Sequence, residues 1–125
     1  MSTKINNIEV LKADEGKRLV YGVVLRPEVP DAHDDVMTSD EIMKSAHNYL
    51  MFYRVVGEQH DKEADAMVAE SYIAPMDMNF DGKSIKKGAW VVAMKVLNDE
   101  LWIKIKDGNF TGLSAGGFAK RNEIV

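Results

Sequence analysis

The sequence predicts a mainly β fold with helices, of the α+β class, in which a closed or strongly curved sheet is accompanied by one long and one short helix. Runs rich in β-branched and aromatic residues recur along the chain, with turn signals between them. Amphipathic helical spacing is sustained over one long stretch. No repeat, linker or low-complexity tract interrupts this pattern, so residues 1–125 are expected to form a single domain.

The first element predicted is a β-hairpin near the start of the chain. Residues 5–13 alternate weakly between apolar and polar side chains, residues 14–17 suit a turn, and the apolar run 18–25 reads as a well-buried second strand. Pro27 and Pro30 close this strand, because each lacks a backbone donor and keeps the preceding residue extended. A loop is expected to follow.

The long helix is predicted to begin at Thr38. Thr38 can cap it while Glu41, three residues on, reaches back to complete a capping box. Apolar residues then recur at three- and four-residue spacing from Ile42 to Tyr53 and form one stripe along the helix. Gly57 is predicted to end this helix.

The second half of the chain is predicted to be mostly strands. A strand is expected over 66–74, and Asp81-Gly82 predicts a two-residue hairpin turn. The run 89–97 is the most strand-like of the sequence and is predicted to lie centrally in a sheet, buried on both faces. The last strand predicted, over 110–119, contains three glycines.

A short helix is predicted between the last two strands. Asn98 can cap it and Gly108 can end it in a left-handed conformation. Leu101, Trp102 and Ile105 would form its buried face.

Composition excludes several classes of chemistry and partner. The chain has 16 Lys and Arg against 20 Asp and Glu, a net charge of -4, and its basic residues are scattered, so no nucleic acid partner is expected. Because Cys is absent, a disulfide, a thiol nucleophile, a zinc–thiolate cluster and an iron–sulfur site are all excluded. Neither a signal-peptide run nor a membrane-spanning apolar stretch is seen, so we expect a soluble protein with no membrane partner.

The most informative segment is the glycine-rich run TGLSAGGF over residues 111–118. On an extended strand, Gly112, Ser114 and Gly116 share one face, so the Ser114 hydroxyl stands between two positions without side chains and a substrate backbone can approach it closely. Glycines weaken a strand unless a bulge, a bend or a close ligand needs the space. Taken alone, the pattern is more typical of a glycine-rich bulge with an inert serine.

The same run matches the nucleophile elbow of α/β-hydrolases. That fold places its acid and its histidine after the serine, whereas only 11 residues follow Ser114 here. A base for Ser114 must therefore come from upstream.

Three histidines lie upstream of Ser114. His47 falls within the predicted helix beside the apolar stripe and is expected to be a partly buried packing residue. His33 belongs to an acidic loop, where solvation or a turn hydrogen bond explains it. His60 follows the helix and precedes the strand over 66–74, where rigid elements can present a side chain, so it is the best candidate base.

Two His-Asp dipeptides suggest a different enzyme class. His33-Asp34 and His60-Asp61 together favour a metal-dependent phosphohydrolase, because imidazole and carboxylate suit divalent metal ions. Such an enzyme needs a mostly helical domain, and the strand-rich pattern argues against it.

Sequence blocks spread over most of the chain resemble, in their order, a known family. The blocks are RLVYGVVL (18–25), DAHDDVM (31–37), AHN (46–48), EQHD (58–61), ESYIAP (70–75), KGAW (87–90) and TGLSAGGF (111–118). In them the chain resembles the phage serine proteases of XkdF type, relatives of the prohead maturation proteases of tailed phages and of the herpesvirus assemblin. A Gln-His-Asp block well upstream of a Gly-Leu-Ser-x-Gly strand is characteristic of these enzymes.

The resemblance implies an assemblin-like β-barrel flanked by helices, with Ser114 and His60 as the catalytic serine and histidine. Ser114 would attack a peptide carbonyl, His60 would take its proton and return one to the leaving amine, and backbone N–H groups would stabilise the oxyanion. No metal ion or organic cofactor is needed. The oxyanion donors stay open, with Gly116 and Gly117 as candidates. The third catalytic residue also stays open, among Glu123, Asp61, the Asp34-Asp35 pair and a residue missing from this chain.

Residues and resemblance together predict a serine endopeptidase of phage capsid maturation. Its expected partners are protein substrates, the scaffold and capsid proteins, with self-cleavage as an open extension, and its expected location is the host cytoplasm, within the assembling procapsid. One alternative is a noncatalytic capsid-assembly or scaffold-binding module that keeps the protease fold, and another is a small β-barrel binding domain unrelated to phages. A homo-oligomer stays open, since Met43 and Met51 could serve a partner surface.

Overall fold

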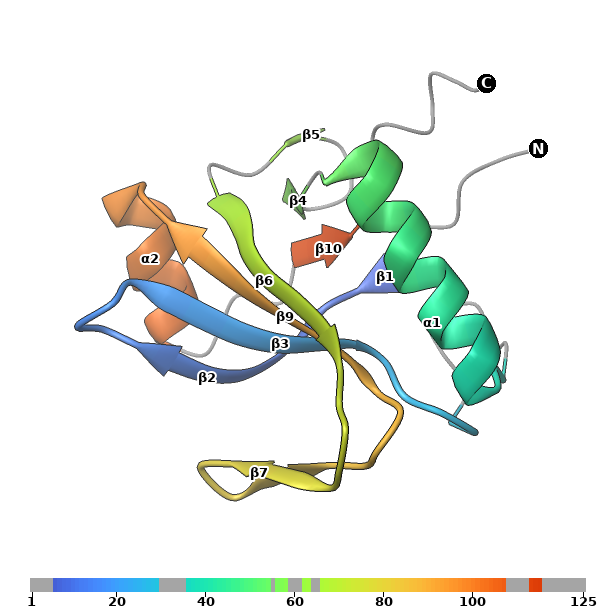
Figure 1. Cartoon of the computed structure of the whole chain (residues 1–125). Coiled ribbons are helices and arrows are strands. Elements are labelled where there is room, and N and C mark those ends of the chain that lie inside the picture. Colours follow the sequence, from blue (N-terminus) through green and yellow to red (C-terminus); the bar gives the residue numbers. More distant parts are fainter. Residues whose placement is uncertain are drawn as a thin grey trace.

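A computed structural model describes residues 6–29, 36–54, 56–58, 62–63, 66–107 and 113–115. The strands are β1 (Asn6–Asn7), β2 (Glu9–Asp14), β3 (Leu19–Leu25), β4 (Val56–Glu58), β5 (Lys62–Glu63), β6 (Ala66–Ile73), β7 (Met78–Phe80), β8 (Lys83–Ile85), β9 (Trp90–Val96) and β10 (Leu113–Ala115). The helices are α1 (Ser39–Asn48), its continuation as a π-helix η1 (Tyr49–Tyr53), and α2 (Asp99–Lys106) (Figure 1).

The strands form two antiparallel four-stranded sheets and a separate hairpin. One sheet has the order β1-β10-β4-β5, the other has the order β2-β3-β9-β6, and β7 pairs with β8. Over the described residues the fold is therefore mainly β with two α-helices, as predicted.

The prediction of a closed or strongly curved barrel is wrong. In the described part of the chain each sheet stays open, with β1 and β5 at the edges of one and β2 and β6 at the edges of the other. A run of short strands with buried faces is common to open sheets and to barrels. Closure depends on which strands pair across the whole chain, and the local pattern does not contain that information.

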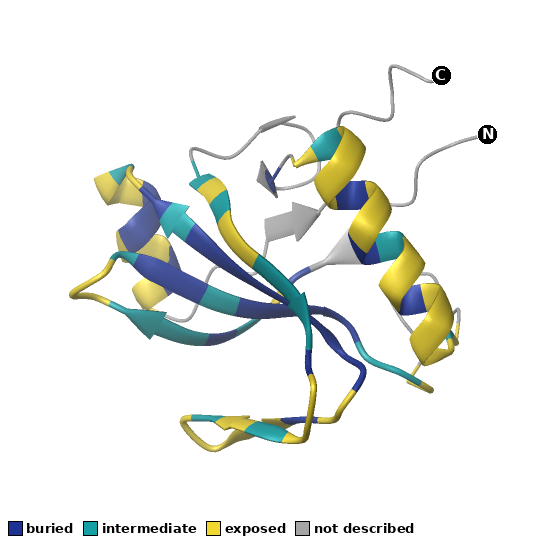
Figure 2. Ribbon diagram, in the orientation of Figure 1, coloured by how far each residue is buried: buried dark blue, intermediate teal, exposed yellow. Residues whose placement is uncertain are grey.

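The sheet β2-β3-β9-β6 is covered on both faces. Alternate residues of β9 point to opposite faces, because side chains alternate along a strand. Trp90, Val92 and Met94 belong to a core that includes buried residues of both α-helices, and Val91 belongs to a second core with Ile85 of the β7–β8 hairpin. In Figure 1 the hairpin lies below this sheet and the helices lie toward its other side. Burial on both faces of β9, and its place between β3 and β6, confirm the prediction for this strand (Figure 2).

The predicted N-terminal hairpin is present as β2 and β3, joined by a turn over residues 15–18. At Ile8 the chain passes from β1 in one sheet directly into β2 in the other, and Ile8 is buried there. Gly22 on β3 lies against this crossing point: a Cβ atom at position 22 would lie 2.4 Å from Cγ2 of Ile8. The absence of a side chain at Gly22 therefore lets the crossing pack closely on β3.

The capping box at the start of α1 forms as predicted. The Glu41 N–H donates to the Thr38 hydroxyl at 3.2 Å, and the Thr38 N–H donates to a Glu41 carboxylate oxygen at 2.9 Å. Ile42, Ala46 and Tyr49 form the buried stripe of the helix.

Two details of this region differ from the prediction. His47 is exposed, because it follows Ala46 in the chain and lies off the buried stripe of the helix. Gly57 does not end the helix; it belongs to β4. The helix continues as η1 and ends at Arg54, which has a left-handed backbone (φ 57°) and donates its N–H to the Tyr49 carbonyl at 2.9 Å. Glycine is common at such a left-handed position, but here arginine occupies it.

The second half of the chain follows the predicted order. β6 occupies the strand expected over 66–74, and β7 and β8 meet at Asp81-Gly82, where both residues have positive φ, as a tight hairpin turn requires. α2 is capped by the Asn98 side chain and buries the three residues predicted for it. Gly108 lies outside the described residues, as do all residues of the predicted strand 110–119 except β10. Within the described residues, no helix has the length and apolar character needed to cross a membrane.

Candidate active site

Ser114 is the middle residue of β10, an interior strand of its sheet. On one side its register partner is Asn7 of β1, and on the other it is Gly57 of β4. Because Gly57 is a glycine, the register position next to Ser114 on β4 carries no side chain. The backbone of Ser114 is thus held by strands on both sides, which is the rigid support that a reactive side chain needs.

β4 reaches β10 because the residues before it are anchored in the core. Tyr49 at the start of η1 is buried, with its ring centroid 5.4 Å from that of Trp90. Val56 is 1% exposed and is the register partner of Ala115. The end of the long helix therefore directs the chain into β4, beside the strand that contains Ser114.

His60, the predicted base, lies outside the described residues. The structure therefore gives no distance between its imidazole and the Ser114 hydroxyl. The described residues on either side of it are in the same sheet as Ser114. Glu58, two residues before His60, is the register partner of Leu113 on β10 and of Lys62 on β5. The described residue two positions before His60 is thus the register partner of the residue directly before Ser114.

Of the other predicted candidates, the described residues include only His47. His47 is placed on the exposed side of α1. Among the side chains described, no group of three or more His, Asp or Glu is arranged to hold a metal ion. The remaining candidates all lie outside the described residues: His33, Asp34, Asp35, Asp61, Gly116, Gly117 and Glu123.

One titratable group described here has a shifted pKa, and it belongs to the other sheet. Burial, with a smaller contribution from the negative charge of Glu70, raises the pKa of Tyr72 on β6 above its usual value.

Sequence reasoning missed the two register partners of Ser114. Asn7 lies in a segment that shows only weak alternation, and Gly57 was interpreted as a helix stop. Strand pairing joins residues far apart in the sequence, so no local signal could have identified either one.

The chain belongs to a family of phage proteins. The model of the family described as "Putative phage serine protease XkdF" matches residues 7–123, which include both Ser114 and His60.

Two proteins of Bacillus subtilis (strain 168) are similar to this chain. The "Uncharacterized protein YqbD" is 46% identical over 113 residues, which cover 90% of this chain and 34% of that protein. The "Phage-like element PBSX protein XkdF" is 45% identical over 104 residues, which cover 82% of this chain and 38% of that protein. This chain thus spans between a third and two fifths of the length of these relatives. No solved structure matches it.

Proposed function

We propose that this chain is a serine endopeptidase of phage capsid maturation, in which Ser114 is the nucleophile and His60 is the general base. The observation that carries the proposal is the pairing of β4 with β10, because Glu58 and Leu113, which closely precede His60 and Ser114, are register partners. The family match over residues 7–123 and its description as a phage serine protease also support it.

The proposed reaction is acyl transfer to serine. The Ser114 hydroxyl oxygen attacks the carbonyl carbon of a peptide bond while the His60 imidazole takes the hydroxyl proton. His60 then gives the proton to the departing amine, and a water molecule, activated by the same imidazole, hydrolyses the acyl-enzyme. Gly57, the register partner of Ser114 on β4, has no side chain, and this favours close approach of a substrate backbone to Ser114.

The proposed substrates are the scaffold and capsid proteins of the assembling procapsid, in the host cytoplasm. Incubation of the purified protein with the scaffold protein of its own phage tests this. Cleavage that is lost in His60→Ala supports the endopeptidase. Stable association without cleavage would instead support a noncatalytic assembly module with this fold.

A serine-directed fluorophosphonate probe tests the nucleophile. The wild type should be labelled, and Ser114→Ala should not be. Ser84→Ala on β8, an exposed serine away from β10, should be labelled like the wild type. Equal labelling of the wild type and Ser114→Ala would remove Ser114 from this role.

The same probe tests the base. His60→Ala should slow labelling by about a hundredfold or more, the range in which general-base catalysis contributes. His47→Ala is the matched control, because His47 is exposed on α1 and should have no effect. Equal rates in both histidine variants would contradict the role of His60.

A further inference from the structure

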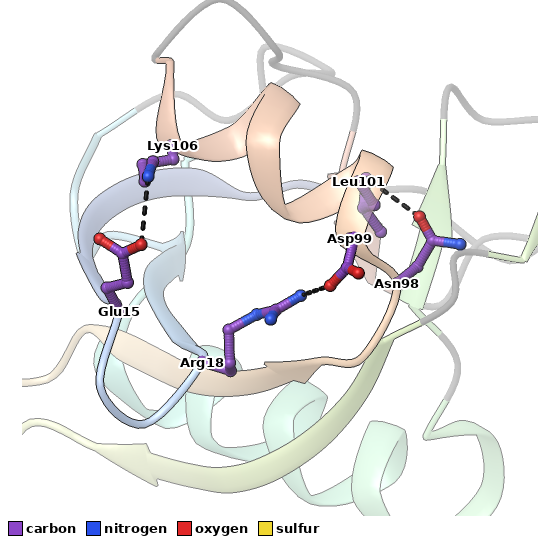
Figure 3. A network of polar contacts seen from close by, with 6 residues as sticks. All are labelled: Glu15, Arg18, Asn98, Asp99, Leu101 and Lys106. Carbon is purple, nitrogen blue, oxygen red and sulfur yellow. Dashed lines mark hydrogen bonds and ion pairs between the residues drawn. The ribbon is translucent and has the colours of Figure 1, made fainter.

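The turn between β2 and β3 contacts α2 along the whole length of that helix (Figure 3). In the first turn of α2, Asp99 accepts a hydrogen bond of 2.7 Å from the Arg18 guanidinium. In the last turn, the Lys106 ammonium lies 3.2 Å from a Glu15 carboxylate oxygen. Between them, the guanidinium carbon of Arg18 lies 5.1 Å from the centre of the Trp102 ring, within the range of a cation–π contact.

The backbone of the same turn holds the residues that precede α2. The Arg18 carbonyl accepts a hydrogen bond of 3.1 Å from the N–H of Val96, the last residue of β9. The Lys17 carbonyl accepts one of 2.9 Å from the Lys95 ammonium. Arg18 therefore contacts the chain both just before α2 and within it.

The segment that this turn holds leads to the nucleophile strand. α2 ends at Lys106, and β10 begins at Leu113. At the other end of the same N-terminal stretch, Asn7 of β1 is the register partner of Ser114. One continuous stretch, residues 6–18, thus contacts both α2 and β10.

We propose that Arg18 is a positioning residue for Ser114: by holding α2 against the β2–β3 turn, it sets the point from which the chain continues into β10. The effect of Arg18 on the reaction at Ser114 rests on the proposed function, whereas its effect on the position of β10 does not.

Stability alone gives a poor account of an arginine at this position. The side chain of Asp99 is 84% exposed, and exposed ion pairs contribute little to stability. Arg18 Nε and Trp102 Nε1 are both buried without a hydrogen-bond partner in the described part of the chain, which is unfavourable. An apolar side chain of similar length would avoid the cost of burying Arg18 Nε without a hydrogen-bond partner.

Arg18→Met is the informative variant, because it keeps a long apolar stem over Trp102 and removes the bond to Asp99. Asp99→Asn weakens the same contact from the helix side. Glu9→Gln is the matched control: the Arg26–Glu9 pair, at 3.0 Å, joins β2 to the residue that follows β3, and Arg26 also bonds to the β8 backbone, not to α2.

Three quantities are measured for each variant: hydrogen exchange of the β10 amides, the melting temperature, and the fluorophosphonate reaction at Ser114, resolved into probe affinity and maximal rate. In Arg18→Met and in Asp99→Asn we expect β10 exchange about three- to tenfold faster and a maximal labelling rate lower by a similar factor. Probe affinity should be unchanged, and the melting temperature should stay within about 3 °C of the wild type. Combining the two substitutions should add little to either one.

Glu9→Gln should match the wild type in all three measurements. Wild-type exchange and labelling in Arg18→Met would overturn the proposal, and so would equal changes in Arg18→Met and Glu9→Gln. If the wild type is not labelled at all, the proposed function fails. Faster β10 exchange confined to the Arg18 and Asp99 variants would still support the positioning role, and unchanged exchange would refute it.

Discussion

Replacing Gly22 by alanine tests whether the crossing at Ile8 packs so closely on β3 that only glycine fits there. The added Cβ atom would lie 2.4 Å from Cγ2 of Ile8 and 3.2 Å from the carbonyl oxygen of Glu9, whereas unstrained carbon atoms approach to about 3.5–4.0 Å. Ile8 is 4% exposed and belongs to the main core, so it cannot move without disturbing its neighbours. Overpacking of this kind costs about 1–3 kcal/mol.

The expected result is a free energy of unfolding lower by about 1–3 kcal/mol in Gly22→Ala, measured by urea denaturation followed by tryptophan fluorescence. Gly16→Ala is the matched control, because a Cβ atom at Gly16 would meet only Asp14, at an ordinary distance of 3.6 Å. That variant should be as stable as the wild type or more stable by up to about 1 kcal/mol, since alanine restricts the unfolded chain.

A double-mutant cycle identifies the contact responsible. Ile8→Ala removes the methyl group that the new Cβ atom would strike, so the loss in Ile8→Ala/Gly22→Ala should be smaller than the sum of the two single losses by about 1 kcal/mol or more. Ile8 directly follows Asn7, the register partner of Ser114, so Gly22→Ala should also slow labelling of Ser114 by the fluorophosphonate probe. Stability equal to that of Gly16→Ala, or strict additivity in the cycle, would refute this account of Gly22.

Two further predictions concern α1 and Tyr72. Thr38→Ala removes the hydroxyl that caps α1 and should lower the free energy of unfolding by about 0.5–2 kcal/mol in the same urea assay, and a loss equal to that of Ser39→Ala, beside the cap, would contradict it. The raised pKa of Tyr72 predicts a stability contribution that is complete below the ordinary tyrosine pKa of 10.0 and is lost as pH rises through the folded-state value, because the unfolded chain gives up the proton first. Tyr72→Phe should therefore lose less stability than the wild type as the pH is raised from about 8 to above 10.0, whereas identical losses would show that Tyr72 does not contribute.

Residues close together in the sequence determined the helices and most of the strands. The capping box at Thr38, the cap at Asn98 and the turn at Asp81-Gly82 each depend on groups no more than three residues apart, so their chemistry is visible in the sequence. The apolar run that becomes β9 has a similar local signature, because a strand that is buried on both faces carries apolar side chains at successive positions instead of alternating apolar and polar ones.

A serine in a glycine-rich run and an upstream histidine were also predicted from the sequence as a catalytic pair, because the two residue types stand in a characteristic order. That order named Ser114 and His60 as candidates, but it contained no information about which strands support them. The described structure supplies the support for Ser114, between Asn7 and Gly57.

Tertiary structure alone decided how the strands combine. Two open sheets formed where a barrel was expected, the chain changed sheets at Ile8, and Gly57 became a strand residue beside Ser114 although it was predicted to stop a helix. The physical reason is the same in each case: pairing and packing join residues that are tens of positions apart, and their free energy depends on neighbours that a local pattern does not contain.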